Sequence, residues 1–289
     1  MPFYHAPPGL PPCDHRKGMD LLCAQKRGRR VLTIPRIFLP YPMEVGFLCD
    51  LREEDQTYIR SVLRLKKNDH LVVFDGQGHE YQAMINSIQA NRTVVEILKK
   101  YPPRDKRVRI TLSQALPKAG KMDFIIQKAT ELGVDRVVPF QSARCVSRLT
   151  DDKKRQKASR WQKIAVEAAR QCGRADVPAI GPCVDFLEMI AIGERKGVKI
   201  IFWEEETQTG LSDVLRRQHS KWAEELFIVV GPEGGFLKEE VDQARHAGFQ
   251  SVSIGRQILR VETAVLAILA IIQYEKGDLG ESMCSGPEQ

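Results

Sequence analysis

The sequence predicts an α/β protein in which a small β-rich domain precedes a larger domain of alternating strands and helices. Three observations predict this class. Short strand-like runs separated by turns fill residues 36–100, strand-like and helical patterns alternate after that, and the length of 289 residues favours two domains. Alternating strands and helices are typical of a mostly parallel sheet. The composition, 43% hydrophobic and 28% charged, excludes collagen, wholesale disorder and a disulfide-stapled miniprotein.

Residues 35–104 are expected to form a small β-barrel. The turn Asp75-Gly76-Gln77-Gly78 separates two strand-like runs, and one short helix is expected over 55–65. The strand-like runs cover residues 36–39, 70–75, 79–85 and 93–98. Residues 1–34 contain two Pro-Pro pairs and a Gly-Arg-Arg run, which predict a disordered basic leader.

Residues 105–277 are expected to form the α/β domain, after a linker at Tyr101-Pro102-Pro103-Arg104-Asp105. Strand-like runs lie at 108–113, 135–140, 198–203, 226–230 and 251–254. Helical patterns cover 119–132, 155–172, 185–192, 211–218, 237–247 and 260–275. Residues 278–289 are expected to be a flexible tail.

The last expected helix is unusually apolar. Between Val261 and Tyr274, eleven of fourteen residues are apolar, and Glu262, Thr263 and Gln273 are the exceptions. A helix that is apolar on every side but too short to cross a bilayer must be buried in protein. We therefore expect it to insert into its own fold or to pack against a partner subunit.

Several classes of protein are disfavoured. No apolar stretch reaches the ~20 residues that a membrane helix requires, and residues 1–30 lack the apolar segment of a secretory leader. The seven cysteines form no Cys-x-x-Cys pair, and the six histidines form no His-x-x-x-His pair. We expect a soluble cytoplasmic protein with reduced thiols and no protein-bound metal.

Basic and acidic residues are segregated along the chain, although the net formal charge is only +7. Residues 99–128 hold nine basic and two acidic residues, and residues 150–174 hold eight and three. Residues 200–245 hold ten acidic and five basic residues. If the two basic segments meet on one face, they form a surface that attracts phosphate. Solvated helix faces would give the same pattern.

Two glycine-containing turns follow strand-like runs and could wall one pocket. In Gly231-Pro232-Glu233-Gly234-Gly235, three glycines in five residues allow close approach of the backbone to a ligand. The pattern is neither a dinucleotide fingerprint nor a phosphate loop, and a plain tight turn would look the same. The second turn, over residues 253–260, ends at Arg260, which could bind phosphate or a developing anion. Alternatively, Arg260 forms a salt bridge with Glu262 or Glu233.

Two further segments place arginines beside small residues, Ser142-Ala143-Arg144-Cys145-Val146 and Arg170-Gln171-Cys172-Gly173-Arg174. Such arginines suit contact with RNA phosphates or base edges. Arginines that pack structurally at turns would look the same.

Taken in order, these segments resemble the RsmE family of 16S ribosomal RNA (uracil-N3) methyltransferases over residues 36–276. The motifs that carry the resemblance in the larger domain are Pro117-Lys118, Gln127 to Val134, Arg144, Trp161, Glu167-Ala168, Gln171, Gly173-Arg174, Gly231 to Gly235, Ile258 to Arg260 and Glu262 to Ala264. In the smaller domain they are Val62-Leu63-Arg64-Leu65 and Phe74 to Gly78. Three places depart from the family pattern, namely Thr57-Tyr58-Ile59-Arg60, Ala143 and Val261.

The resemblance implies a PUA-like RNA-binding barrel joined to a SPOUT-type α/β domain whose C-terminal chain threads through a loop as a trefoil knot. It implies S-adenosylmethionine as the cofactor, a homodimer, and methylation of uridine N3 in the 16S rRNA of the small ribosomal subunit. Two alternatives are a SPOUT enzyme that acts on another RNA position and a non-catalytic RNA-binding factor for ribosome assembly.

The implied reaction assigns roles to residues. Arg260, Arg174 and Glu262 are the expected catalytic residues, and Glu233 is an alternative to Glu262 as proton acceptor. The expected cofactor-binding residues are Trp203, Glu204, Gly231, Pro232, Glu233, Gly234, Gly235, Ile254, Gly255, Ile258 and Leu259. The expected RNA-binding residues are Arg36, Arg60, Arg64, Lys128, Arg144, Gln171 and Arg174. The methyl donor is already activated, so the reaction needs no metal or thiolate, and Cys145 and Cys172 are expected to be structural.

Overall fold

The computed structural model describes residues 34–280, apart from residues 119, 147–148, 195–196 and 218–223. The expected leader, except for Ile34, and the tail after residue 280 lie outside the described residues. The described chain contains two separate sheets, each with its own strand order.

The first sheet has five strands in the order β1-β3-β4-β5-β2. They are β1 (Arg36–Phe38), β2 (Leu48–Asp50), β3 (His70–Phe74), β4 (Glu80–Gln89) and β5 (Arg92–Tyr101). β1 runs parallel to β3, and the other pairs are antiparallel. A short helix α2 (Glu53–Thr57) continues as the π-helical segment η1 (Tyr58–Leu63). Both outer strands contribute to one core, through Ile37 in β1 and Cys49 in β2, as expected for a barrel-like domain.

The second sheet is entirely parallel, which confirms the predicted α/β class. Its order is β12-β10-β11-β6-β7-β8, with β9 beside β7. The strands are β6 (Val108–Ala115), β7 (Arg136–Gln141), β8 (Ala179–Ile180), β9 (Val184–Asp185), β10 (Val198–Phe202), β11 (Glu224–Val230) and β12 (Gln250–Val252). The trefoil knot implied by the resemblance stays a prediction.

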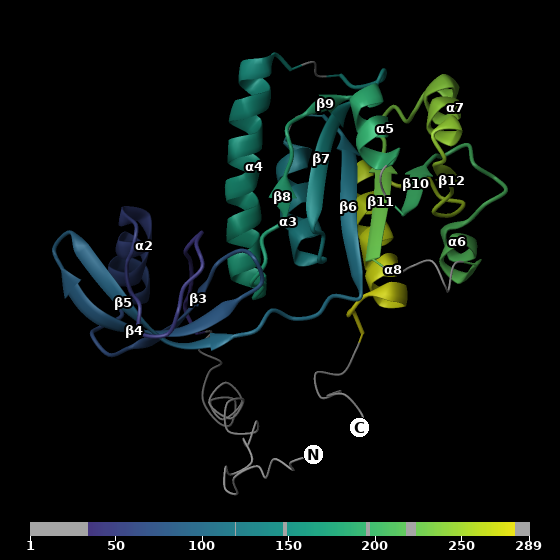
Figure 1. Ribbon diagram of the computed structural model, residues 1–289. Coiled ribbons are helices and arrows are strands. Elements are labelled where there is room, and N and C mark those ends of the chain that lie inside the picture. Colours follow the sequence, from purple (N-terminus) through teal and green to yellow (C-terminus); the bar gives the residue numbers. More distant parts are fainter. Residues whose placement is uncertain (1–33, 119, 147–148, 195–196, 218–223, 281–289) are drawn as a thin grey trace, which may run out of the picture. The chain divides into compact units, whose positions relative to one another are not determined.

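Helices cover both faces of this sheet (Figure 1). Those on one face are α3 (Lys121–Glu131), α4 (Asp151–Cys172), α6 (Leu211–Arg217) and α8 (Val261–Lys276). On the other face lie α5 (Phe186–Glu194) and α7 (Lys238–His246). The central strand β11 is buried on both sides. Leu226 and Ile228 pack in the core beneath α3, α4, α6 and α8, whereas Phe227 and Val229 pack in the core beneath α5 and α7.

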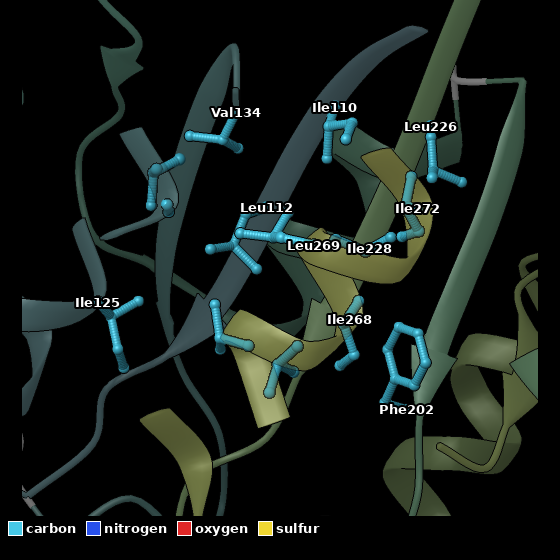
Figure 2. Packing of buried hydrophobic residues seen from close by; sticks show 14 of the residues in the cluster. Ile110, Leu112, Ile125, Val134, Phe202, Leu226, Ile228, Ile268, Leu269 and Ile272 are labelled. Carbon is cyan, nitrogen blue, oxygen red and sulfur yellow. The ribbon is translucent and has the colours of Figure 1, made fainter. Parts of the chain in front are cut away.

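Helix α8 is buried along one stripe only. Val265, Ile268, Leu269 and Ile272 are inaccessible to solvent, and Figure 2 shows Ile268, Leu269 and Ile272 beside the strands of the sheet. On the opposite side, however, Tyr274 is 68% exposed. The chain's own fold therefore covers only one face of this helix, and the expected packing against a partner subunit stays a prediction.

Candidate functional site

Three neighbouring strands, β10, β11 and β12, end at one cleft of about 470 Å³. Ligands of open α/β sheets bind at this carboxyl edge, and the volume is in the usual range of a small-molecule site. The cleft is lined by residues 202–204, 230–235, 252–261 and 264. Every residue that the sequence analysis assigned to the cofactor is therefore brought to this one place.

The first glycine turn is closely packed against the cleft. Gly235 has φ +68°, and a Cβ on it would overlap the carboxylate of Glu204. A Cβ on Gly231 would lie 3.1 Å from the ring of Phe236. A Cβ on Gly234 would instead meet the side chain of Arg144 at 3.2 Å. Glycine at 231 and 235 thus allows Phe236 and Glu204 to pack directly against the turn. A side chain at residue 234 would instead contact Arg144.

The second turn is open. Gly255 has φ +149° and no atom within 4 Å of where a Cβ would lie, and its amide donates to Ser253 Oγ at 3.3 Å. Ile258, at the cleft wall, is 89% exposed. Backbone polar groups and an uncovered apolar side chain suit a ligand that is part apolar and part polar. Trp203 adds a buried indole Nε1–H that has no hydrogen-bond partner among the described residues.

Lys121 forms ion pairs with both candidate proton acceptors, Glu233 and Glu262. The sequence did not mark Lys121 as a site residue. Its Nζ lies 3.1 Å from Glu233 Oε1 and 2.9 Å from Glu262 Oε2. The backbone amide of Lys118 also donates to Glu233 Oε2 at 3.1 Å. These contacts join the start of α3, the first glycine turn and the start of α8. No local pattern marks Lys121, because both partners are distant in sequence.

The ion pairs keep both carboxylates charged. Hydrogen bonds to Glu262 and Glu233 raise the pKa of Lys121, and the bond from Lys121 lowers the pKa of Glu262. Burial alone would raise the pKa of Glu233, but its own backbone amide, Lys121 and the Lys118 amide together lower it. A carboxylate with a lowered pKa is a weaker proton acceptor, so these contacts favour an electrostatic and structural role for both.

Arg260 is the N-cap residue of α8, lines the cleft and is exposed. In the described part of the chain, no ion pair joins it to Glu233 or Glu262, both of which are held by Lys121. Its guanidinium is therefore placed to meet a ligand in the cleft.

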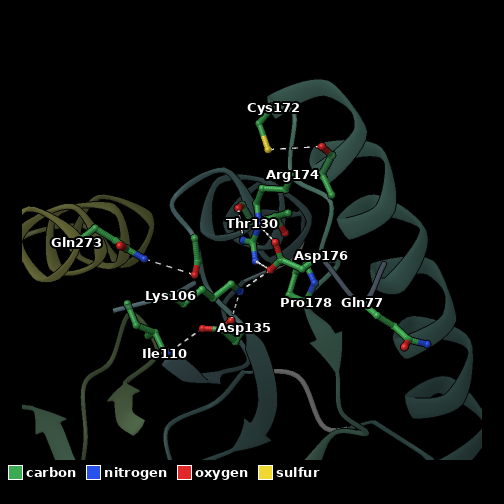
Figure 3. A network of polar contacts seen from close by, with 12 residues as sticks. Gln77, Lys106, Ile110, Thr130, Asp135, Cys172, Arg174, Asp176, Pro178 and Gln273 are labelled. Atoms are coloured by element: carbon green, nitrogen blue, oxygen red, sulfur yellow. Dashed lines mark hydrogen bonds and ion pairs between the residues drawn. The ribbon is translucent and has the colours of Figure 1, made fainter. Parts of the chain in front are cut away.

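Arg174 precedes β8, on the side of the sheet where the strands begin, and Figure 3 shows it within a polar network there. Its Nη1 donates to the carbonyl of Thr130 at 2.6 Å, and its guanidinium pairs with Asp176. Asp176 also pairs with Lys106, which pairs with Asp135. Asp135 in turn accepts a hydrogen bond from the amide of Ile110 near the start of β6.

These contacts hold the side chain of Arg174 away from the cleft of its own chain. Burial alone would raise the pKa of Asp176, but Arg174 and Lys106 outweigh it and lower that pKa to about 2. Within its own chain, Arg174 therefore lies at the amino edge of the sheet, where its side chain is 12% exposed and hydrogen-bonded. Its predicted catalytic and RNA-binding roles stay predictions.

The other predicted RNA-binding residues are dispersed. Arg144 lies beside the cleft, where its Nη1 donates to the carbonyl of Gly234 at 2.8 Å. Arg36 pairs with Glu80 at 2.7 Å, and Arg60 donates to Gln56, Ala90 and Thr93, so both are held within the fold. Lys128 pairs with Glu131 on α3, whereas Arg64 and Gln171 are exposed.

Two other kinds of site were sought in the part of the chain that the structure describes. Its helices include none with the length and apolarity needed to cross a bilayer. No group of three or more His, Cys, Asp or Glu side chains is arranged to hold a metal ion among the same residues.

Comparison with known families defines the class of the protein. Residues 104–273 match the family model of an RNA methyltransferase domain, and residues 51–98 match that of an RNA methyltransferase PUA domain. The first match includes both glycine turns and Arg260, and the second covers α2, η1, β3, β4 and most of β5. The fold and the cleft are thus those of an RNA methyltransferase with an added PUA domain.

Individual relatives narrow the class to one family. The chain is 31% identical to the ribosomal RNA small subunit methyltransferase E of Bacillus subtilis over 225 residues, which cover 77% of this chain and 88% of the relative. It is 30% identical to the protein of the same name from Buchnera aphidicola, over 85% of this chain and 98% of the relative. The chain belongs to the ribosomal RNA small subunit methyltransferase E family.

Solved structures agree with this family. A ribosomal RNA small subunit methyltransferase E from Neisseria gonorrhoeae, bound to S-adenosyl methionine, is similar with a TM-score of 0.77 and 33% identity, over 85% of this chain and 99% of that one. A methyltransferase from Legionella pneumophila in complex with the same cofactor has a TM-score of 0.76 and 29% identity over the same shares.

Proposed function

We propose that this protein methylates N3 of a uridine in the 16S rRNA of the small ribosomal subunit, with S-adenosylmethionine as methyl donor. The observation that carries the proposal is the cleft at the ends of β10, β11 and β12, where both glycine turns and Arg260 meet. Its support is the family membership and the S-adenosyl methionine bound in the similar Neisseria gonorrhoeae protein.

The described residues fit the proposed cofactor. The first turn lines the cleft with the backbone of Gly231 to Gly235, and the second turn offers further backbone groups around Gly255. Ile258 and Leu259 would cover the adenine, and the unpartnered Nε1–H of Trp203 adds a donor at the wall. When bound, S-adenosylmethionine supplies a methyl group already activated on its sulfonium.

The work left to the protein is to position the base and to stabilise charge. N3 of uracil must pass its proton to solvent water before it can accept the methyl group, so negative charge develops on the base. Arg260, exposed at the cleft and in no ion pair with Glu233 or Glu262 among the described residues, would stabilise that charge or the adjoining phosphate. Glu233 and Glu262, paired with Lys121, would hold the start of α3 and α8 in place around it.

We further propose that the protein is a homodimer that acts in the cytoplasm. The exposed side of α8, including Ile271 and Tyr274, is an apolar surface that a second copy would cover. We also propose that Arg144, beside the first glycine turn, contacts the RNA. The measured molar mass of the purified protein in solution tests the dimer.

Two measurements test the proposed function. Titration calorimetry should show S-adenosylmethionine binding to the purified protein, and nucleoside analysis of ribosomal RNA from a deletion strain should show loss of 3-methyluridine alone. Loss of a different modified nucleoside would favour the alternative of another target atom. Absence of cofactor binding would favour a non-catalytic assembly factor.

A further inference from the structure

A second hollow lies between the amino-terminal part of α3 and the first half of α4. This α3–α4 pocket has a volume of about 380 Å³, and its floor is formed by apolar side chains that include Pro117, Met122 and Leu149. Lys118, Lys157 and Arg160 stand around it. It is the place where the two basic segments of the sequence, 99–128 and 150–174, come together.

The charge around the α3–α4 pocket is positive and only partly balanced. Asp123 is the one carboxylate among its described lining residues, and it is already engaged, because it pairs with Arg160 and accepts a hydrogen bond from Trp161 Nε1 at 3.1 Å. No carboxylate in the described part of the chain pairs with Lys118 or Lys157. The ammonium of Lys157 lies 5.6 Å from the centre of the Trp161 ring, so it stays at the pocket.

The α3–α4 pocket adjoins the proposed cofactor cleft. The side of Lys118 that faces the cleft is its backbone amide, which donates to Glu233 in the first glycine turn. Lys121, one helical turn away, bridges Glu233 and Glu262. Lys118 and Lys121 thus connect the lining of the two hollows, so a nucleic acid whose target base enters the cleft could extend over the pocket.

We propose that the α3–α4 pocket binds an unpaired nucleotide of the RNA that neighbours the methylated uridine. This inference rests on the proposed function. The apolar floor would receive the base, and Lys118 and Lys157 would contact the flanking phosphates. A base held in a duplex cannot enter such a hollow, so the pocket selects single-stranded or looped RNA near the target.

The test compares two charge reversals on α4, Lys157→Glu in the pocket and Lys163→Glu outside it. Affinity is measured by fluorescence anisotropy for an RNA hairpin with a uridine-containing loop, at several salt concentrations. We expect Lys157→Glu to weaken binding on the order of tenfold and to reduce the salt slope by about one, because one phosphate contact is lost. Lys163→Glu should cause a clearly smaller change. Equal effects of the two variants would overturn the proposal.

A second variant tests the hollow itself rather than its charge. Gln156 lines the pocket and is exposed, so Gln156→Trp should fill it without changing the charge or the core. Wild type should prefer the hairpin to a duplex of the same sequence, and Gln156→Trp should lose that preference. An unchanged preference would contradict the proposal. The affinity for S-adenosylmethionine should be the same in every variant as in the wild-type protein. If the wild-type protein itself did not bind S-adenosylmethionine, that result would refute the proposed function, independently of the pocket.

Discussion

Two arginines at opposite edges of the parallel sheet differ in their exposure to solvent and in their bonding partners. At the carboxyl edge, Arg260 stands exposed at the cleft while Lys121 neutralises the nearby carboxylates. At the amino edge, Arg174 is enclosed by Thr130 and Asp176. Both arginines lie in glycine-containing segments between regular elements. Only the partners that the fold supplies distinguish an arginine available to a ligand from one that holds the fold together.

The largest effect should come from the exposed arginine. Arg260→Ala should slow methyl transfer by about 2–4 kcal/mol, roughly 30- to 1,000-fold, because a pre-organised group for the developing charge is lost. Single-turnover kinetics with saturating cofactor measures this. Arg216→Ala, an exposed arginine on α6, is the matched control and should leave the rate near wild type. A near-normal rate for Arg260→Ala would remove this residue from the catalytic site.

The arginine at the other edge should affect stability instead of turnover. Arg174→Ala leaves Asp176 without its nearest cation and frees the carbonyl of Thr130, so the free energy of unfolding should fall by about 2–3 kcal/mol. The exposed pair of Arg155 with Asp152 is a control, and Arg155→Ala should cost at most about 0.5 kcal/mol. Equal costs for the two variants in urea unfolding would show that the network contributes little. Cofactor affinity should be unchanged in both.

The same network should make stability depend on pH. The pKa of Asp176 is about 2 in the folded protein and near its ordinary value of 3.8 when unfolded. The unfolded state therefore binds a proton first as the pH falls, so this stabilisation is complete above about pH 4 and is lost toward pH 2. It is worth on the order of 2 kcal/mol. Asp176→Asn should flatten the stability profile in that window, and an unchanged slope would rule out Asp176 as its source.

A smaller effect, on S-adenosylmethionine affinity, should distinguish the two glycine turns. Gly235→Ala forces a residue with φ +68° to carry a Cβ where the carboxylate of Glu204 lies, whereas the Cβ of Gly255→Ala meets nothing within 4 Å. Both variants strain the backbone, but only the first displaces a cleft residue. We expect Gly235→Ala to weaken S-adenosylmethionine binding about tenfold more, near 1.4 kcal/mol. Calorimetry that ranks them in the other order would mean that the first turn is not part of the cofactor site.

The sequence predicted the cleft because its signal is local. A glycine turn directly after a buried strand must lie at the carboxyl edge of a parallel sheet. The two turns follow β11 and β12, which flank β10, and they meet at one cleft. The strands β2, β8 and β9 were missed, because two or three residues carry no periodicity. Lys121 was missed because both of its partners come from distant segments. The apolar composition of α8 likewise did not reveal which of its faces the chain itself would cover.

The most direct test is a crystal structure of the protein with S-adenosylmethionine. We expect the cofactor between the turns at Gly231–Gly235 and Ile254–Leu259, with its methyl group open to the side where Arg260 stands. Cofactor bound in another hollow, such as the α3–α4 pocket, or a methyl group turned away from Arg260, would contradict the assignment of the cleft and of its catalytic arginine.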